Sequence, residues 1–368
     1  MMPAEMAMTT LLAIETSCDE TAAAVIADGR RILSNVVLSQ IDLHQRFGGV
    51  FPEMASRAHV ESIGLVIRDA LQQSGKSWND LDGIAVTCGP GLPGSLVVGV
   101  NAAKGVSLAR RLPLIGINHL EGHIYSHWLE SSGGADPLVY RLEGAFGSPF
   151  PLLVLIVSGG HTELVLMRDH GDYQLIGYTV DDAIGEAFDK VARMLHLGYP
   201  GGPAIEQAAL GGNPARYRLS RPKVHASIRT ARPGALTADE YLFSFSGAKT
   251  AVLNIVQQHS IDGKLSPFAP VADIAAGFQD SVTDWLVDKA HRAAQEFGAR
   301  AVLVGGGVSA NQMLRDKMKH RFGVSASFPQ RIFSTDNAAM IGAAAHFSFV
   351  RGVRHDLTLD ISPDLKLG

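Results

Sequence analysis

Apolar and polar positions follow the same order in two separate stretches of the chain. Residues 11–37, LLAIETSCDETAAAVIADGRRILSNVV, contain an apolar run, a polar turn, a second run, a turn at Gly29 and a third run. Residues 152–179 repeat this plan, with a turn at Gly171. Short apolar runs bounded by turn residues predict strands, so we expect two related three-stranded arrangements.

Segments with helical periodicity and further apolar runs follow each copy of this plan. In the first half they predict a helix over 59–75, strands over 83–89 and 114–118, and a helix entered through glycine at 93–111. In the second half they predict helices over 183–197, 203–211, 272–297 and 309–321, a strand over 300–307, and a last helix from Asn337. Alternating strands and helices indicate an α/β protein with sheets covered by helices.

Length and composition describe an ordinary globular protein. The 368 residues suffice for two domains, and the chain is 46% hydrophobic and 18% charged. Its two cysteines, Cys18 and Cys88, exclude a disulfide scaffold and suit a reducing compartment. No basic leader precedes the first strand and no apolar run approaches the roughly 18 residues of a membrane span. We therefore expect a soluble, cytoplasmic protein without membrane contact.

Charge is uneven along the chain. The formal net charge is -4, which gives no overall nucleic-acid signature. One stretch, from about 213 to 235, is nevertheless basic and lacks acidic residues; its cations are Arg216, Arg218, Arg221, Lys223, Arg229 and Arg232. Phosphate contact and a solvated surface loop are both open interpretations of it.

Glycine and hydroxyl residues gather where strands are predicted to end. The tips TSCDET and SGGHT follow the first strand of each copy, and VLVGGGVSAN joins a strand to a helix. Such turns can direct backbone N–H groups at phosphate oxygens. Together they favour a nucleotide cleft between two facing tips, although each cluster alone also suits a tight structural turn.

Three histidines recur at every fourth position in NHLEGHIYSH: His119, His123 and His127. A pair at this spacing shares one helix face and can close on a metal ion, or can equally be surface or core histidine. A zincin protease places its glutamate one residue after the first histidine. Glu121 comes two residues after His119 and faces away, so this spacing argues against a metalloprotease.

The motifs together resemble the universal tRNA threonylcarbamoyltransferase family, called TsaD in bacteria, some members of which were once labelled O-sialoglycoprotein endopeptidases. The resemblance runs in family order from about residue 10 to 345, through IETSCDETA, GGVFPEMASRAHV, TCGPGLPGSL, NHLEGH, LIVSGGHTELV, DDAIGEAFDKVARML, YPGGPAIE, FSFSGAKTAV, GGGVSANQMLR and FSTDNAAMIGAAA. It implies a two-lobed fold of the actin, sugar-kinase and Hsp70 (ASKHA) type, with duplicated mixed sheets around a nucleotide cleft. The implied lobes cover 10–130, completed by a C-terminal helix at about 337–355, and 150–336, with 131–149 as an added loop.

The resemblance also implies an activity and a site. The activity is transfer of threonylcarbamoyl from threonylcarbamoyl-AMP to N6 of the adenosine 3′-adjacent to the anticodon in tRNAs that read ANN codons, with release of AMP. His119, His123 and Asp336 are the implied metal ligands. The implied adenylate contacts are Ile156, Val157, Ser158, Gly159, Gly160, Asp189, Gly202, Asn311 and Glu206; at the position of Glu206, related members have Asp.

Cofactors and partners follow from the same resemblance. One divalent metal ion per subunit is expected, Fe²⁺ before Zn²⁺, and ATP or ADP with Mg²⁺ is an alternative nucleotide. The expected partners are tRNA, a degenerate paralogue (TsaB) and a small ATPase (TsaE), with a weak homodimer as a further assembly. No general base is evident; Asp19, Glu20 and His161 are the candidates at the tips.

Two other function classes stay open at this point. The ASKHA fold also serves small-molecule kinases and ATPases, in which Glu15, Asp19 and Glu20 would supply carboxylates for Mg²⁺. That chemistry leaves the histidine pair without a role. A nucleotide-bound scaffold without catalysis is the other class, and the wide apolar spread of helix 59–75 admits a partner surface as well as burial against a sheet.

Overall fold

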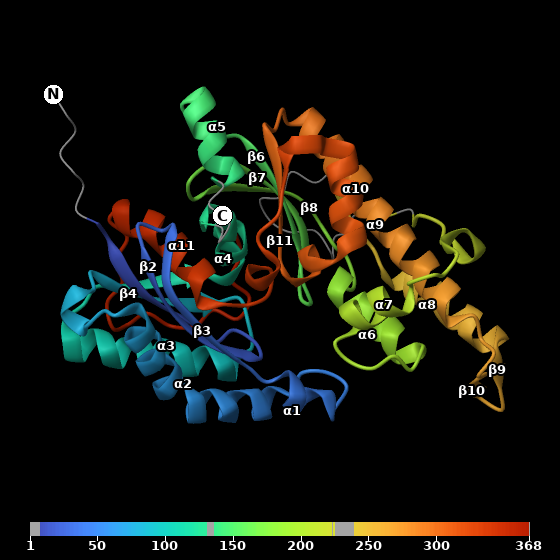
Figure 1. The fold of residues 1–368 in the computed structure, drawn as a ribbon, viewed down its shortest axis with the longest axis horizontal. Coiled ribbons are helices and arrows are strands. Elements are labelled where there is room, and N and C mark those ends of the chain that lie inside the picture. Colours follow the sequence, from blue (N-terminus) through green and yellow to red (C-terminus); the bar gives the residue numbers. More distant parts are fainter. Residues whose placement is uncertain (1–7, 131–135, 223, 225–238, 368) are drawn as a thin grey trace. The chain divides into compact units, whose positions relative to one another are not determined.

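The computed structural model describes residues 8–130, 136–222, 224 and 239–367, and these divide into two compact units. The first unit comprises residues up to 44, 50–148 and 335–367, and the second comprises 45–49 and 149–334. Each unit contains a five-stranded mixed sheet (Figure 1). In the described residues, no helix combines the length and the apolar composition that a membrane span needs.

The sheet of the first unit has the order β3-β2-β1-β4-β5. Antiparallel pairs join β1 to β2 and β2 to β3, whereas β4 is parallel to both β1 and β5. The strands are β1 (Thr10–Glu15), β2 (Glu20–Ala27), β3 (Arg31–Ser39), β4 (Gly83–Gly89) and β5 (Leu114–Asn118). β1, β4 and β5 therefore end at the same edge, the usual position of a ligand site in such a sheet.

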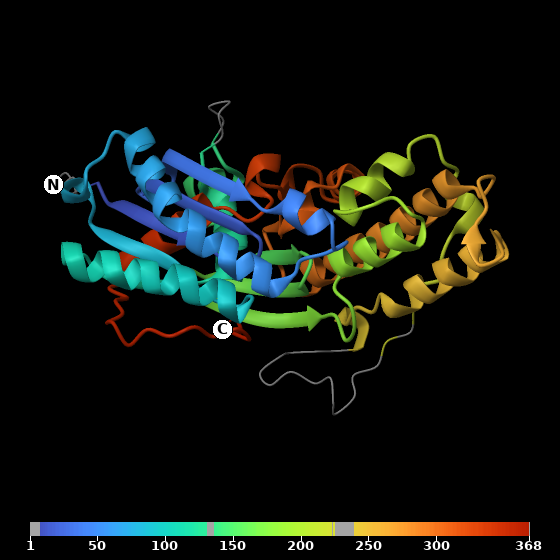
Figure 2. The same ribbon diagram turned by 90° about the horizontal axis from the view of Figure 1, so that it is seen from below.

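Helices cover both faces of this first sheet. Leu12 and Ile14 pack in the core with α2 and α3, which lie side by side in Figure 2. The opposite face meets α11, where Gly342 comes so close that a Cβ would stand 2.5 Å from Ile26. The helices of this unit are α1 (Ile41–Gln45), α2 (Pro52–Ser74), α3 (Pro93–Arg110), α4 (His119–Tyr125), α5 (Leu138–Phe146) and α11 (Ala338–Val350).

The second unit repeats the topology, with the order β12-β11-β6-β7-β8. Its three-stranded meander is antiparallel and β11 is parallel to both β6 and β12. The strands are β6 (Leu152–Val157), β7 (Thr162–Asp169), β8 (Asp172–Tyr178), β11 (Ala301–Gly305) and β12 (Ala326–Ser327), with a separate hairpin of β9 (Ser260–Ile261) and β10 (Lys264–Leu265). The meander predicted over 152–179 is thus confirmed, as is the one over 11–37.

One face of the second sheet carries a helical layer around α9. Leu153, Leu155 and Val157 of β6 share a core with residues of five helices. These helices are α6 (Ile184–Met194), α7 (Gly201–Ala208), α8 (Ser246–Gln258), α9 (Val271–Glu296) and α10 (Gln312–Phe322). The helix at 246–258 has no counterpart among the helices predicted above, and the 131–149 segment, expected as a loop, contains α5.

The last described residues run back along the first sheet. The His355 N–H donates to Leu114 O (2.8 Å), and the Ser362 N–H donates to Cys88 O (2.7 Å). Leu359 packs against the sheet core, whereas Leu357 is 45% exposed. This strap, residues 353–367, reaches the edge at which β4 and β5 end.

We expect Leu359→Ala to lower the free energy of unfolding by about 1–3 kcal/mol, because it removes partly buried methyl groups. The control is Leu357→Ala on the same strap, which removes an exposed side chain and should change stability by less than about 0.5 kcal/mol. Urea unfolding of both variants makes the comparison. Equal effects would show that the strap does not contribute to the core.

Candidate metal centre and nucleotide-binding turns

Two helix starts position the candidate metal ligands within the first unit. Asn118 caps α4 by accepting a hydrogen bond from the Leu120 N–H (2.8 Å), which places His119 at the first helical position. Asn337 caps α11 by accepting from the Met340 N–H (3.1 Å), and Asp336 directly precedes it. The two helices pack closely, because a Cβ on Gly122 would stand 2.7 Å from a side-chain carbon of α11.

The side chains of His119, His123 and Asp336 converge, with one ligand atom from each lying within 4.8 Å of the others. Asp336 Oδ1 stands 3.5 Å from His119 Nε2 and 3.3 Å from His123 Nε2. His123 is 1% exposed, and neither of its ring nitrogens has a hydrogen-bond partner of good geometry among the described residues. A buried imidazole in that condition, beside a second imidazole and a carboxylate, fits a divalent ion of the Fe²⁺ or Zn²⁺ class.

A wholly buried carboxylate, Glu15, lies behind this cluster at the end of β1. Its Oε2 is 3.1 Å from His119 Nδ1. Burial lowers the pKa of His119, but the carboxylates of Asp336 and Glu15 outweigh burial and raise it to about 9. Without a metal ion, the imidazole is therefore protonated at neutral pH.

We expect metal affinity to increase with pH up to about 9, because the ion must displace a proton from His119. The pKa is raised, so the competing proton is bound below about pH 9 and absent above it. Below about pH 9, the apparent metal affinity should fall by about tenfold for each unit by which the pH is lowered. Competition with a chelator of known protonation constants measures this dependence, and a flat profile between pH 7 and 9 would contradict it.

The third histidine of the sequence motif is not part of the cluster. His127 lies in a short 3-10 turn after α4 and is 4% exposed, so it is a core histidine and not a surface one. The two cysteines have thiol pKa values above the ordinary range, which argues against a nucleophilic role. Burial and Asp19 raise the pKa of Cys18, and burial raises that of Cys88 to about 11.

Two further acids follow β1 in the same unit. Asp19 is 9% exposed, and burial together with the charges of Asp19 and Asp336 raises the pKa of Glu20. Glu20 therefore carries a proton at neutral pH, which suits a donor better than a base. Glu15, proposed for Mg²⁺ in the kinase alternative, is committed to His119, Thr87 and the Ser17 N–H, and this argues against that alternative.

The predicted adenylate residues of the second unit start at the end of β6. Ile156 and Val157 are both fully buried, so only their backbone can meet a ligand. The turn that follows is exposed at Gly159 and Gly160, and the Ser158 hydroxyl accepts from the backbone N–H of His161, the candidate base (3.0 Å). The N-terminus of α6 touches this turn, where a Cβ on Gly185 would stand 2.7 Å from Ser158 O.

The other predicted adenylate residues lie at helix starts. Asp189 Oδ1 accepts from the Gly201 N–H (2.7 Å) at the start of α7, which also carries Gly202 and Glu206. Glu206 Oε1 accepts from the Gln312 N–H (2.7 Å) at the start of α10. Asn311 caps α10 through Leu314 and donates to Gln279. Its side chain is therefore already bonded at both ends, which leaves backbone contact as its simplest role.

A network around Asp181 and Asp182 was not recognised from the sequence as a site. Ser244 and Ser246 both donate to Asp181, which fixes the start of α8. Lys190 pairs with Glu186 (2.7 Å), which lies one helical turn away. Lys190 and Lys249 also pair with Asp182, and no local sequence pattern indicated this convergence.

The basic stretch contributes ion pairs to the second unit. The described arginines pair with aspartates of α9: Arg216 with Asp273, Arg218 with Asp284 and Arg221 with Asp288. Lys223, Arg229 and Arg232 lie outside the described residues. The described part is thus a surface segment held to α9, with its charge largely balanced.

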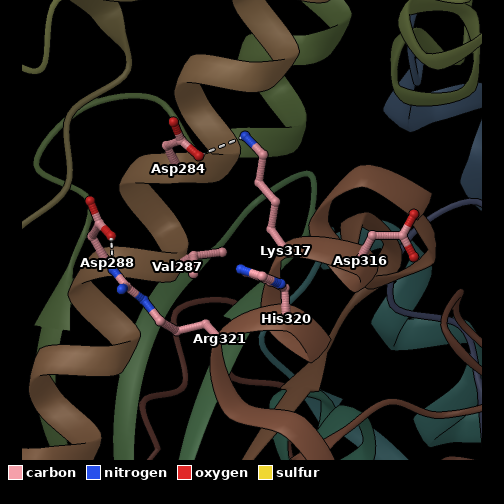
Figure 3. A pocket seen from close by; sticks show the side chains of 7 residues that line it. All are labelled: Asp284, Val287, Asp288, Asp316, Lys317, His320 and Arg321. Atoms are coloured by element: carbon pink, nitrogen blue, oxygen red, sulfur yellow. Dashed lines mark hydrogen bonds and ion pairs between the residues drawn. The ribbon is translucent and has the colours of Figure 1, made fainter.

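A hollow of about 620 Å³ lies next to this segment, between α9 and α10 (Figure 3). Lys317 is paired with Asp284 (2.7 Å) and Arg321 with Asp288 (2.6 Å). The lining residues are Asp284, Val287, Asp288, Asp316, Lys317, His320 and Arg321. None of them is a predicted site residue, and the paired charges give no preference for an anion or a cation.

Comparisons with known proteins show the family of the chain. Residues 31–343 match the family model for TsaD, tRNA N6-adenosine threonylcarbamoyltransferase. Proteins of that name from Thermomicrobium roseum and Bacillus subtilis are 50% and 46% identical to the chain; each alignment covers 97% of this chain, and 96% and 95% of those proteins.

The solved structures show the fold alone. HypF from T. kodakarensis has a TM-score of 0.58 at 14% identity, over 94% of this chain and 48% of that one. Full-length HypF in a phosphate- and nucleotide-bound form has a TM-score of 0.52 at 12% identity, over 93% and 46% of the two chains. Both agree with the predicted ASKHA class. By its sequence, the chain belongs to the tRNA N6-adenosine threonylcarbamoyltransferase family.

Proposed function

We propose that this transferase moves threonylcarbamoyl from threonylcarbamoyl-AMP to N6 of the adenosine 3′-adjacent to the anticodon in tRNAs that read ANN codons, and releases AMP. The observation that carries the proposal is the convergence of the buried His119 and His123 with the partly buried Asp336 in a member of this family. A phosphotransferase has no use for two imidazoles there, whereas a metal-assisted acyl transfer does.

The metal centre would be held by these three side chains, with Fe²⁺ expected before Zn²⁺. When bound, such an ion supplies a Lewis acid that stabilises negative charge developing on a substrate oxygen. Three protein ligands leave coordination positions open for a substrate. The chain's own contribution is to hold this ligand set in a buried, preorganised geometry, supported by the caps of α4 and α11.

The adenylate would lie against the turns of the second unit. The exposed Ser158–Gly160 turn offers backbone N–H groups without side-chain obstruction at either glycine, because no atom lies within 4 Å of a Cβ on Gly159 or Gly160. Asp189, Gly202, Glu206 and Asn311 would line the adjoining helix starts. ATP or ADP with Mg²⁺ is the alternative nucleotide for the same turns.

The proposed reaction does not require a strong general base from the chain. The adenine amine can lose its proton after attack, so no strong base is needed at N6. Glu20 has a raised pKa and would carry a proton toward the departing group more readily than it would take one. Asp19 and His161 remain the candidates for accepting the amine proton.

The partners proposed beside tRNA are the paralogue TsaB and the ATPase TsaE. A weak homodimer is a further proposed assembly. The proposed compartment is the cytoplasm. The surface of α2 supports a protein partner, because its apolar residues Val60 and Leu65 are 65% and 47% exposed. Its predicted burial against the first sheet holds for Val66, Ile67 and Leu71.

The donor tests the proposal directly. Purified protein with its partners is mixed with unmodified tRNA and threonylcarbamoyl-AMP, and both AMP and the modified nucleoside are quantified. We expect them to form in equal amounts. AMP release without nucleoside modification would reduce the activity to hydrolysis, and ADP formation stimulated by a sugar would revive the kinase alternative.

A further inference from the structure

Glu15 has a position that neither the sequence motif nor the ligand set explains. It is fully buried at the last position of β1. Its Oε1 accepts from the Ser17 N–H, and its Oε2 accepts from the Thr87 hydroxyl (2.6 Å). The same Oε2 lies 3.1 Å from His119 Nδ1. A carboxylate is therefore held from three sides, with one side being a candidate metal ligand.

The hydrogen bonds determine which nitrogen of His119 keeps its proton when the ring becomes neutral, as metal binding requires. The Ser17 hydroxyl also lies 3.1 Å from Nδ1 and could donate to it. In that arrangement, however, the bare Nδ1 lone pair would face the Glu15 carboxylate oxygen, and two acceptors would repel each other. Placing the proton on Nδ1 removes the repulsion, because Nδ1–H then donates to Glu15. The lone pair is left on Nε2, the nitrogen that lies 3.5 Å from Asp336.

We propose that Glu15 is a positioning residue for the metal centre: it accepts the Nδ1–H of His119 and so fixes the ring with Nε2 toward the ion. Ligating histidines commonly donate their second N–H to a carboxylate in this way, which sets the tautomer and increases ligand basicity. The inference rests on the proposed metal centre and deepens it. Thr87 and the Ser17 backbone in turn donate hydrogen bonds to the carboxylate. Residues at the end of β1, near the end of β4 and at the start of α4 therefore fix the orientation of the His119 ring.

Glu15→Gln tests the role without changing side-chain size. A carboxylate accepts hydrogen bonds at both oxygens, whereas the glutamine amide accepts only at its one oxygen. In Glu15→Gln, either the Ser17 N–H or the His119 Nδ1–H must therefore face the NH₂ group. If the NH₂ faces His119, the proton moves to Nε2 and blocks metal binding. The matched control is Thr87→Val, which removes a hydrogen bond to the same buried oxygen without touching the imidazole.

The readout is Zn²⁺ affinity, measured by competition with a chromophoric chelator at fixed pH and supported by thermal unfolding of the metal-free proteins. We expect Glu15→Gln to weaken binding by about 10- to 100-fold, and Thr87→Val to weaken it much less, because the carboxylate still accepts from the Ser17 N–H and from His119. Equal weakening in both variants, or none in Glu15→Gln, would overturn the positioning role. Wild-type affinity in His119→Ala would instead show that the metal centre itself is wrongly assigned.

A measurement on the unaltered protein covers the case in which Glu15→Gln fails to fold. Zinc-loaded protein with ¹⁵N-labelled histidine gives separate signals for protonated and metal-bound ring nitrogens. The signals of His119 are those that disappear from the spectrum of His119→Ala. We expect them to show a protonated Nδ1 and a metal-bound Nε2. A metal-bound Nδ1 would overturn the inference.

Discussion

His119→Ala should abolish stoichiometric metal binding and tRNA modification together. The substitution removes one of the three converging ligand atoms and leaves Glu15 buried without its imidazole partner. A Lewis acid contributes several kcal/mol of transition-state stabilisation, so we expect the modification rate to fall by at least about 1000-fold. Metal content by elemental analysis and a single-turnover assay on the same preparation make the measurement.

His127→Gln is the matched control for this loss. His127 follows the same four-residue spacing and is equally buried, but it lies outside the cluster. Its variant should retain metal at wild-type stoichiometry. Full metal occupancy in His119→Ala, or equal metal loss in the two variants, would remove the basis for the ligand assignment.

Gly306→Ala should strongly destabilise the second unit and weaken adenylate binding. Gly306 has a φ of +91°, and a Cβ there would stand 2.4 Å from Val157 O, a backbone atom that cannot move aside cheaply. Backbone conformations of this kind cost about 1–3 kcal/mol for other residues, and the overlap adds to that cost. We expect the free energy of unfolding to fall by about 2–4 kcal/mol.

The neighbouring glycine provides the control. A Cβ on Gly307 would meet no atom within 4 Å and its φ is not positive, so Gly307→Ala should cost less than about 1 kcal/mol. Urea unfolding compares the two variants, and AMP calorimetry reports on the adjoining Ser158–Gly160 turn. If both variants are equally stable, the close approach of Gly306 to β6 does not constrain the fold.

Periodicity was sufficient for the elements that line the cores. Both three-stranded meanders, the strands 83–89 and 114–118, and the helix after Asn337 follow from apolar spacing, because each element buries a face set by its own period. Helix starts were harder. The helix predicted from His59 begins at Pro52, because residues 52–58, PEMASRA, contain one large apolar side chain and add little to the apolar periodicity.

Long-range convergence lay beyond any local pattern. The pairing of Asp336 with the two histidines came from the family resemblance, because more than 200 residues separate them in the sequence. The burial of His127 and the contact of Glu15 with His119 depend on packing between α4, α11 and the ends of β1 and β4. For Glu15, the sequence signal was a glutamate at the end of an apolar strand. This signal was equally compatible with Mg²⁺ binding in a kinase.

The most direct test is nucleoside mass spectrometry of unmodified tRNA incubated with threonylcarbamoyl-AMP, the TsaB and TsaE partners, and this protein in three states: metal-loaded, metal-stripped and restored with Fe²⁺ or Zn²⁺. The account predicts threonylcarbamoyladenosine with the loaded and restored protein and almost none with the stripped protein. Equal product in all three states would contradict a metal-assisted transfer at His119, His123 and Asp336.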